Sequence, residues 1–93
     1  MNDDNSDLLH KATIGMDAET FLGTNLGRKL VERAAAHADE ATEKLKKCSP
    51  IDAAMIRDLQ NEIWKAESFK DWIAEIIQEG WNAEQELSGS QID

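Results

Sequence analysis

The chain has 93 residues, of which 41% are hydrophobic, so it can form one small domain and is too short for a two-domain enzyme. Nineteen acids against ten bases give a net charge of −9, which disfavours direct binding to nucleic acid. The single cysteine excludes an intramolecular disulfide, and the apolar runs are far shorter than the roughly 20 residues that cross a membrane. The acidic start lacks the pattern of a signal peptide, so we expect an intracellular protein.

Both ends of the chain read as tails around a helical centre. Residues 1–16 are polar and acidic without sustained periodicity, and we expect a flexible tail there. Residues 88–93 carry the Gly and Ser of a frayed end. Residues 17–87 contain no alternating β pattern and a single Pro, in the pair Ser49-Pro50. The expected fold class is therefore all-α: a long antiparallel helical hairpin with a turn at 49–50.

The first helix is expected over about residues 17–48, beginning either near Asp17 or near Leu26, after an interruption at 23–25. Its inward positions recur every three or four residues and are mostly small. They are Leu26, Leu30, Ala34, His37, Ala38, Ala41, Leu45 and Cys48. Cys48, which ends this row, is expected to be a buried, inert residue rather than a reactive thiol.

The second helix is expected over about residues 50–87, with Ser49 as N-cap, Pro50 at the first helical position and Asp52 in the first turn. Its inward row is mostly bulky. It comprises Ile51, Met55, Leu59, Ile63, Ala66, Phe69, Ile73, Ile76, Gly80, Ala83 and Leu87. A small face set against a bulky face predicts close antiparallel packing of the two helices.

The two expected helices differ in length. The second would be roughly 57 Å long and the uninterrupted part of the first about 33 Å, unless the second kinks or ends at Gly80. Its far end must be covered either by Phe21, Leu22 and the N-terminal segment, or by another chain. Because small scaffolds without disulfides or metals commonly oligomerise, we expect a homodimer with a four-helix arrangement.

Three tryptophans mark the expected association surface. Trp64 lies well away from the inward row of the second helix, and Trp72 and Trp81 lie at its edges. Aromatic side chains concentrate contact energy at interfaces, so an interface is expected here. Its expected members are Trp64, Trp72, Ile73, Ile76 and Trp81.

His37 and Glu62 are the residues on the inward rows that could carry chemistry, and folding about the turn brings them level. Such a pair can serve as acid and base, as part of a metal site, or as a structural ion pair. A di-iron bundle needs Glu-x-x-His, whereas Ala34 precedes His37 by three and Lys65 follows Glu62 by three. We therefore expect a buried structural pair, no metal, no cofactor and no enzymatic activity.

Acids recur every four residues along the second helix and form a ribbon of Glu67, Asp71, Glu75 and Glu79. Lys65 and Lys70 are expected to pair with some of the neighbouring carboxylates. The ribbon is typical of a solvated helix face. The alternative is that it imitates nucleic-acid phosphates or docks on a basic partner.

Two segments carry a resemblance. FLGTNLGRKLVERA at 21–34 and IRDLQNEIWKAESFKDWIAEIIQEGWNA at 56–83 resemble a group of small tailed-bacteriophage or prophage helical proteins of unassigned function. The matching features are Phe21-Leu22, Leu26-Gly27-Arg28, Leu59-Gln60, Ala66, Phe69, Trp72-Ile73 and Gly80. The resemblance implies a phage origin, often beside head and DNA-packaging genes, and supplies no catalytic or ligand-binding residues.

Two functions follow as hypotheses. The first is a non-enzymatic phage structural or assembly protein that oligomerises and binds another phage protein. The second is an acidic helical antagonist of a host nucleic-acid-binding or defence protein. Either would act in the host bacterial cytoplasm, the first also in the virion, as a homo-oligomer that contacts neither nucleic acid nor a membrane.

Overall fold

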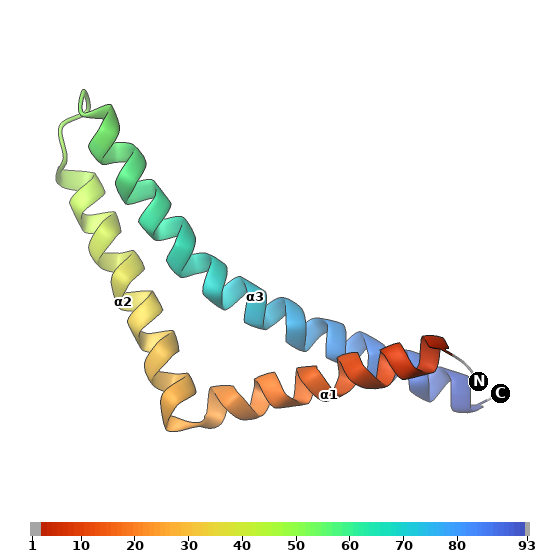
Figure 1. The fold of residues 1–93 in the computed structure, drawn as a ribbon. Helices are drawn as coiled ribbons and strands as arrows, with labels where there is room; N and C mark the ends of the chain where they lie inside the picture. The colour runs from red at the N-terminus through yellow and green to blue at the C-terminus, as the bar shows by residue number, and fades with distance from the viewer. Residues whose placement is uncertain (1–2, 93) are drawn as a thin grey trace.

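The computed structural model describes residues 3–92, and the side chains of residues 5–89, as three α-helices. They are α1 (Asp3–Gly23), α2 (Asn25–Lys47) and α3 (Ala53–Ile92). Figure 1 shows α1 and α2 meeting at a corner, with α3 running back along α2 and then crossing α1. The predicted all-α class is confirmed for the described residues.

The predicted flexible tail is wrong from Asp3 onward, because this segment is the helix α1 and packs on the second half of α3. Ala12 and Gly15 are buried in that contact. The sequence left two ways to cover the far end of the second helix, the N-terminal segment or another chain. Within one chain, the N-terminal segment covers it. Residues 1–2 of the predicted tail lie outside the described residues. At the other end, α3 continues to Ile92, past its predicted end, and Asp93 also lies outside.

The corner between α1 and α2 is built by Thr24, which lies in the extended region with φ −79° and ψ 159°. Its hydroxyl accepts a hydrogen bond of 2.9 Å from the backbone N–H of Gly27, as an N-cap should. Its own N–H and hydroxyl donate to the carbonyl oxygen of Phe21, in the last turn of α1. A β-carbon at Gly27 would overlap that same carbonyl. The corner therefore needs a capping residue at 24 and glycine at 27.

The turn between α2 and α3 differs from the expected helix start. Asp52, not Ser49, caps α3, because its Oδ1 accepts a hydrogen bond of 3.1 Å from the N–H of Met55. Ser49 instead closes the turn, its carbonyl accepting from the N–H of Asp52 at 3.0 Å. Pro50 thus lies in the turn and α3 begins at Ala53.

The inner faces of the helices repeat every seven residues. Along α3 the repeat is Leu59, Ala66, Ile73, Gly80 and Leu87, each buried or half-buried. Along α2 and its C-cap it is Gly27, Ala34, Ala41 and Cys48, also buried or half-buried. A seven-residue repeat keeps one face turned toward a partner helix along a gentle left-handed supercoil. This spacing lets a helix of 40 residues follow first α2 and then α1.

The crossing of α1 and α3 is a contact between two glycines. A β-carbon built on Gly15 would lie 2.8 Å from the Cα of Gly80, and one built on Gly80 would lie 2.8 Å from the Cα of Gly15. Ala12 and Ala83, both buried, lie one turn away on either helix. The two backbones therefore touch, with no room for larger residues.

The result is a thin layer rather than a compact domain. The chain measures 62 × 28 × 17 Å and its radius of gyration is 18.9 Å, against about 12 Å for a compact domain of this length. It exposes 7144 Å², against about 5,400 Å² for a typical monomer of 10.4 kDa. Its buried hydrophobic residues are Ala12, Ala41, Leu59, Ala66 and Ala83. The described residues thus form one layer of helices without a second layer to cover it.

We predict that Gly80→Ala destabilises the chain, because its methyl group would force α1 away from α3. Overpacking of this kind costs about 1–3 kcal/mol. Gly89→Ala is the matched control, since it lies in the same helix with open space around it. Urea unfolding followed by circular dichroism measures both. Equal stability of the two variants would contradict the glycine contact.

Candidate functional site

The expected association surface divides into two parts in the structure. Trp64 and Trp72 are 65% and 60% exposed, and Ile76 is also exposed. Ile73, in contrast, is half-buried where the three helices meet. The indole N–H of Trp81 donates a hydrogen bond of 2.6 Å to Oε1 of Glu19, which ties α3 to α1. The exposed part of the expected surface is therefore Trp64, Trp72, Ile76 and Trp81, of which Trp81 is bonded to α1.

Trp64 and Trp72 belong to a surface that we call the outer face of α3. Asp71 follows Trp64 by seven residues, and Glu75 follows Asp71 by four, so they share one side of the helix. Trp64 lies about 160° around α3 from the buried Ala66 and therefore points away from α2, whereas Trp72 lies about 120° from Ala66, toward the side of Lys65. The outer face consists of Trp64, Ser68, Asp71, Trp72 and Glu75.

Ser68, in the middle of the outer face, is nevertheless buried. Its hydroxyl donates a hydrogen bond of 2.7 Å to the carbonyl of Trp64, one turn before it. Side chains four residues apart are neighbours on a helix, so the two indole rings flank Ser68 on either side. The outer face thus presents two aromatic side chains already arranged around a small residue.

All four members of the acidic ribbon, Glu67, Asp71, Glu75 and Glu79, are exposed. No ion pair within residues 5–89 involves any of them. The expected partners Lys65 and Lys70 make none either, so the predicted pairing within the helix is wrong. Their ammonium groups lie on long, mobile stems, and holding them against an exposed carboxylate costs side-chain entropy. The ribbon therefore faces solvent without a cationic partner in these residues.

His37 and Glu62 face each other, with Nε2 and Oε2 3.2 Å apart. The expectation that they are buried is wrong, because their side chains are 55% and 49% exposed. A contact this open adds at most about 1 kcal/mol. Among the described residues, no three His, Cys, Asp or Glu side chains are grouped so as to hold a metal ion. The pair links α2 to α3 at the surface.

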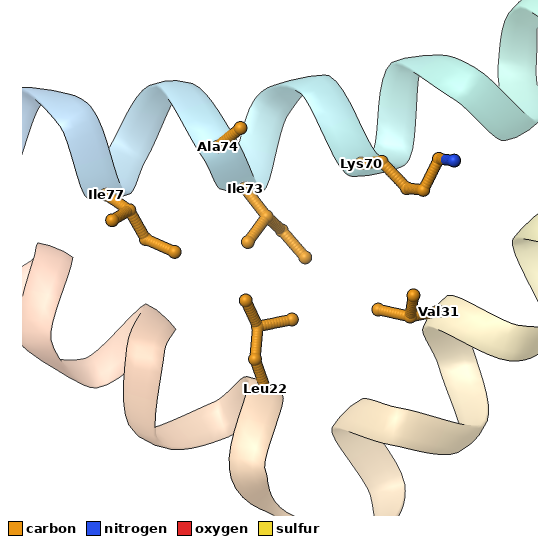
Figure 2. Close-up of a pocket in the computed structure, with 6 residues that line it drawn as sticks. All are labelled: Leu22, Val31, Lys70, Ile73, Ala74 and Ile77. Carbon is orange, nitrogen blue, oxygen red and sulfur yellow. The ribbon is translucent and has the colours of Figure 1, made fainter.

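A small apolar cavity lies where the three helices meet. Figure 2 shows Leu22 of α1 and Val31 of α2 pointing toward Ile73 and Ile77 of α3, with Lys70 at the edge. The volume is about 240 Å³, and its lining is almost entirely apolar. The cavity lies inside the corner, where α1 and α2 diverge from Thr24 and α3 passes across the opening between them. Half-buried Cys48 likewise faces open space, at the other end of α2.

Two hollows lie between α2 and α3 on one face of the layer, and we call the row that they form the groove. Its middle is a hollow of about 350 Å³ with an apolar floor and Arg33, His37 and Lys65 at its rim. The floor is formed by Leu30, Ala34, Ala66 and Phe69. A second hollow, of about 270 Å³, lies toward the turn and is lined by Lys44, Lys47, Cys48, Met55 and Leu59. Steps of three and four residues place both hollows on the same side of α2.

Reasoning from the sequence overlooked this groove. Arg33 and Lys65 look like ordinary surface bases when each helix is read alone. The available signal was the seven-residue spacing, which puts exposed Leu26 on the side of Arg33 and Trp72 on the side of Lys65. Only the pairing of the two helices joins these sides into one groove.

Comparisons of the chain with models of protein families, with curated proteins and with solved structures find no match. Over the part of the chain that the structure describes, no helix has both the length and the apolar character needed to traverse a bilayer.

Proposed function

We propose that this chain is a non-enzymatic structural or assembly protein of a tailed phage, which self-associates through α3 and binds another phage protein. The observation that carries the proposal is the thin layer of helices with its large aromatic residues outside. Trp64 and Trp72 are mostly exposed, while the largest buried hydrophobic residue is Leu59. Monomers rarely leave aromatic anchors beside an open apolar groove, whereas interaction proteins use both.

The exposed area of the chain is large enough to allow self-association. The chain exposes roughly 1,700 Å² more than a compact monomer of its mass, and a standard interface buries about 800 Å² on each partner. A second copy laid against the layer would supply the missing second layer and give the four-helix arrangement. The smallest assembly that achieves this is a homodimer, and further surface would remain for another protein.

The phage setting rests on the resemblance of residues 21–34 and 56–83 to small helical phage proteins. These segments include Gly27, needed at the corner, and Gly80, needed at the crossing. The resemblance therefore concerns positions on which this fold depends. Under this proposal the chain works in the host bacterial cytoplasm or in the virion, without a cofactor and without touching nucleic acid or a membrane.

The second candidate is an acidic antagonist of a host nucleic-acid-binding or defence protein. The observation that favours it is the ribbon of exposed, unpaired carboxylates along α3. A row of such charges would meet a basic protein through contacts that weaken steeply with salt, because exposed charges are screened over about 8 Å at physiological ionic strength.

We predict that sedimentation equilibrium of the full chain at micromolar concentration gives about twice the chain mass. Trp72→Ala should shift the protein toward the monomer, because Trp72 is an exposed aromatic anchor of the outer face. Ile51→Ala is the control, since Ile51 is 92% exposed at the turn, away from this face. A monomer at every concentration, with helix content intact, would overturn self-association.

The two functions differ in the partner they name. We predict that affinity capture from infected cells recovers a phage portal, coat or terminase protein, and that the complex survives 0.5 M salt, because apolar docking is little affected by screening. Recovery instead of a basic host protein that is released by the same salt would replace the assembly function with the antagonist.

A further inference from the structure

The groove between α2 and α3 is unusual for so acidic a chain, because every charged residue that lines its two hollows is basic. Arg33 and Lys65 border the middle, and Lys44 and Lys47 border the end near the turn. Lys44 pairs with Glu40, but Arg33, Lys65 and Lys47 make no ion pair within the described residues. The groove thus combines an apolar floor with unneutralised positive charge.

The outer face of α3 has the opposite charge and a matching apolar part. Trp64 and Trp72 project from it, and Asp71 and Glu75 lie beside them without an ion-pair partner in the described chain. The helices as a whole show the same division: α2 contains six bases and four acids, and α3 contains three bases and eight acids. One chain therefore carries both halves of a complementary contact.

Asp71 and Glu75 do not pair with Arg33 or Lys65 within one chain. Trp64, Asp71 and Glu75 point away from α2, whereas Trp72, seven residues after Lys65, lies where the outer face borders the groove. In a two-fold dimer, a contact between different surfaces of two copies occurs twice, once in each direction. A dimer built in this way would neutralise both sets of charges and cover both sets of apolar side chains.

We propose that the outer face of α3 from a second copy docks in the groove between α2 and α3, and that the first copy does the same in return. Trp72 lies over the floor formed by Leu30 and Phe69, while Asp71 and Glu75 face Arg33 and Lys65. The four helices α2 and α3 of both copies form the two-layered core that one chain lacks. This inference rests on the proposed self-association and names the surfaces that carry it.

The experiment reverses the sign of the charges on one surface at a time. A groove variant, Arg33→Glu with Lys65→Glu, places acids opposite the partner's acids. An outer-face variant, Asp71→Lys with Glu75→Lys, places bases opposite the partner's bases. Each alone should raise the dimer dissociation constant about 100-fold or more, because facing like charges cost several kcal/mol. An equimolar mixture restores opposite charges at both contacts and should give a 1:1 heterodimer by native mass spectrometry.

Two control variants carry the same changes of charge at positions of α2 outside both surfaces. Arg28→Glu with Lys46→Glu matches the groove variant, and Glu32→Lys with Asp39→Lys matches the outer-face variant. Both should dimerise like the unaltered chain. Circular dichroism checks the helix content of every variant. If a charge-reversed variant loses helix, the neutral versions Arg33→Gln with Lys65→Gln and Asp71→Asn with Glu75→Gln should each still weaken the dimer at least tenfold.

The outcomes separate the two proposals. An unaltered chain that stays monomeric overturns self-association and this contact together. A chain that dimerises while either surface variant also dimerises normally, or whose variants fail to associate when mixed, overturns this contact and leaves self-association standing. Monomeric variants that form the heterodimer only on mixing support the contact.

Discussion

Gly15 and Gly80 approach so closely that neither position has room for a β-carbon, and the arrangement of the three helices depends on that approach. The contact holds α1 against the far half of α3 by backbone rather than by bulky side chains. Because Ala12 and Ala83 flank it, the helices meet over small residues and bury little large apolar surface. The chain consequently lies flat, with a thickness of 17 Å.

Because the chain is flat, several of its large apolar side chains are exposed and available for contacts with other molecules. Trp64 and Trp72 stand on the outer face of α3, and the groove beside α2 remains open with Arg33 and Lys65 at its rim. The acidic side of α3 and the basic rim of the groove cannot neutralise each other within one chain. Exposed aromatic anchors, an uncovered apolar floor and separated charges all favour a protein that works by binding copies of itself and a partner.

The sequence predicted the parts of the fold that bulky side chains define. The break near Thr24, the turn near Pro50 and the approach of His37 to Glu62 are found. The inward rows are found only in part, because Leu26, Ile51, Met55 and Ile76 are exposed. The helix α1 was missed because its buried positions are alanine and glycine, which carry little hydropathic signal. The cap of α3 was placed at Ser49 because Ser and Asp both suit an N-cap, and only the turn geometry favours Asp52.

The candidate site was only partly predictable for a related reason. The aromatic residues of the outer face stand out from the helical periodicity of α3 alone. The groove depends on which side of α2 lies beside which side of α3, and this relation involves residues about 30 positions apart, such as Arg33 and Lys65. The exposure of His37 and Glu62 was likewise hidden, because a layer one helix deep leaves even its inward-leaning side chains open to solvent.

Small-angle X-ray scattering of the full chain over a series of concentrations tests most directly whether the layer acquires a second layer. If a second copy lies along the groove, the particle doubles in mass while its longest dimension stays close to the 62 Å of one chain. A particle of single-chain mass with a radius of gyration of 18.9 Å at every concentration would contradict the account. A dimer joined end to end, and so far longer than one chain, would contradict it as well.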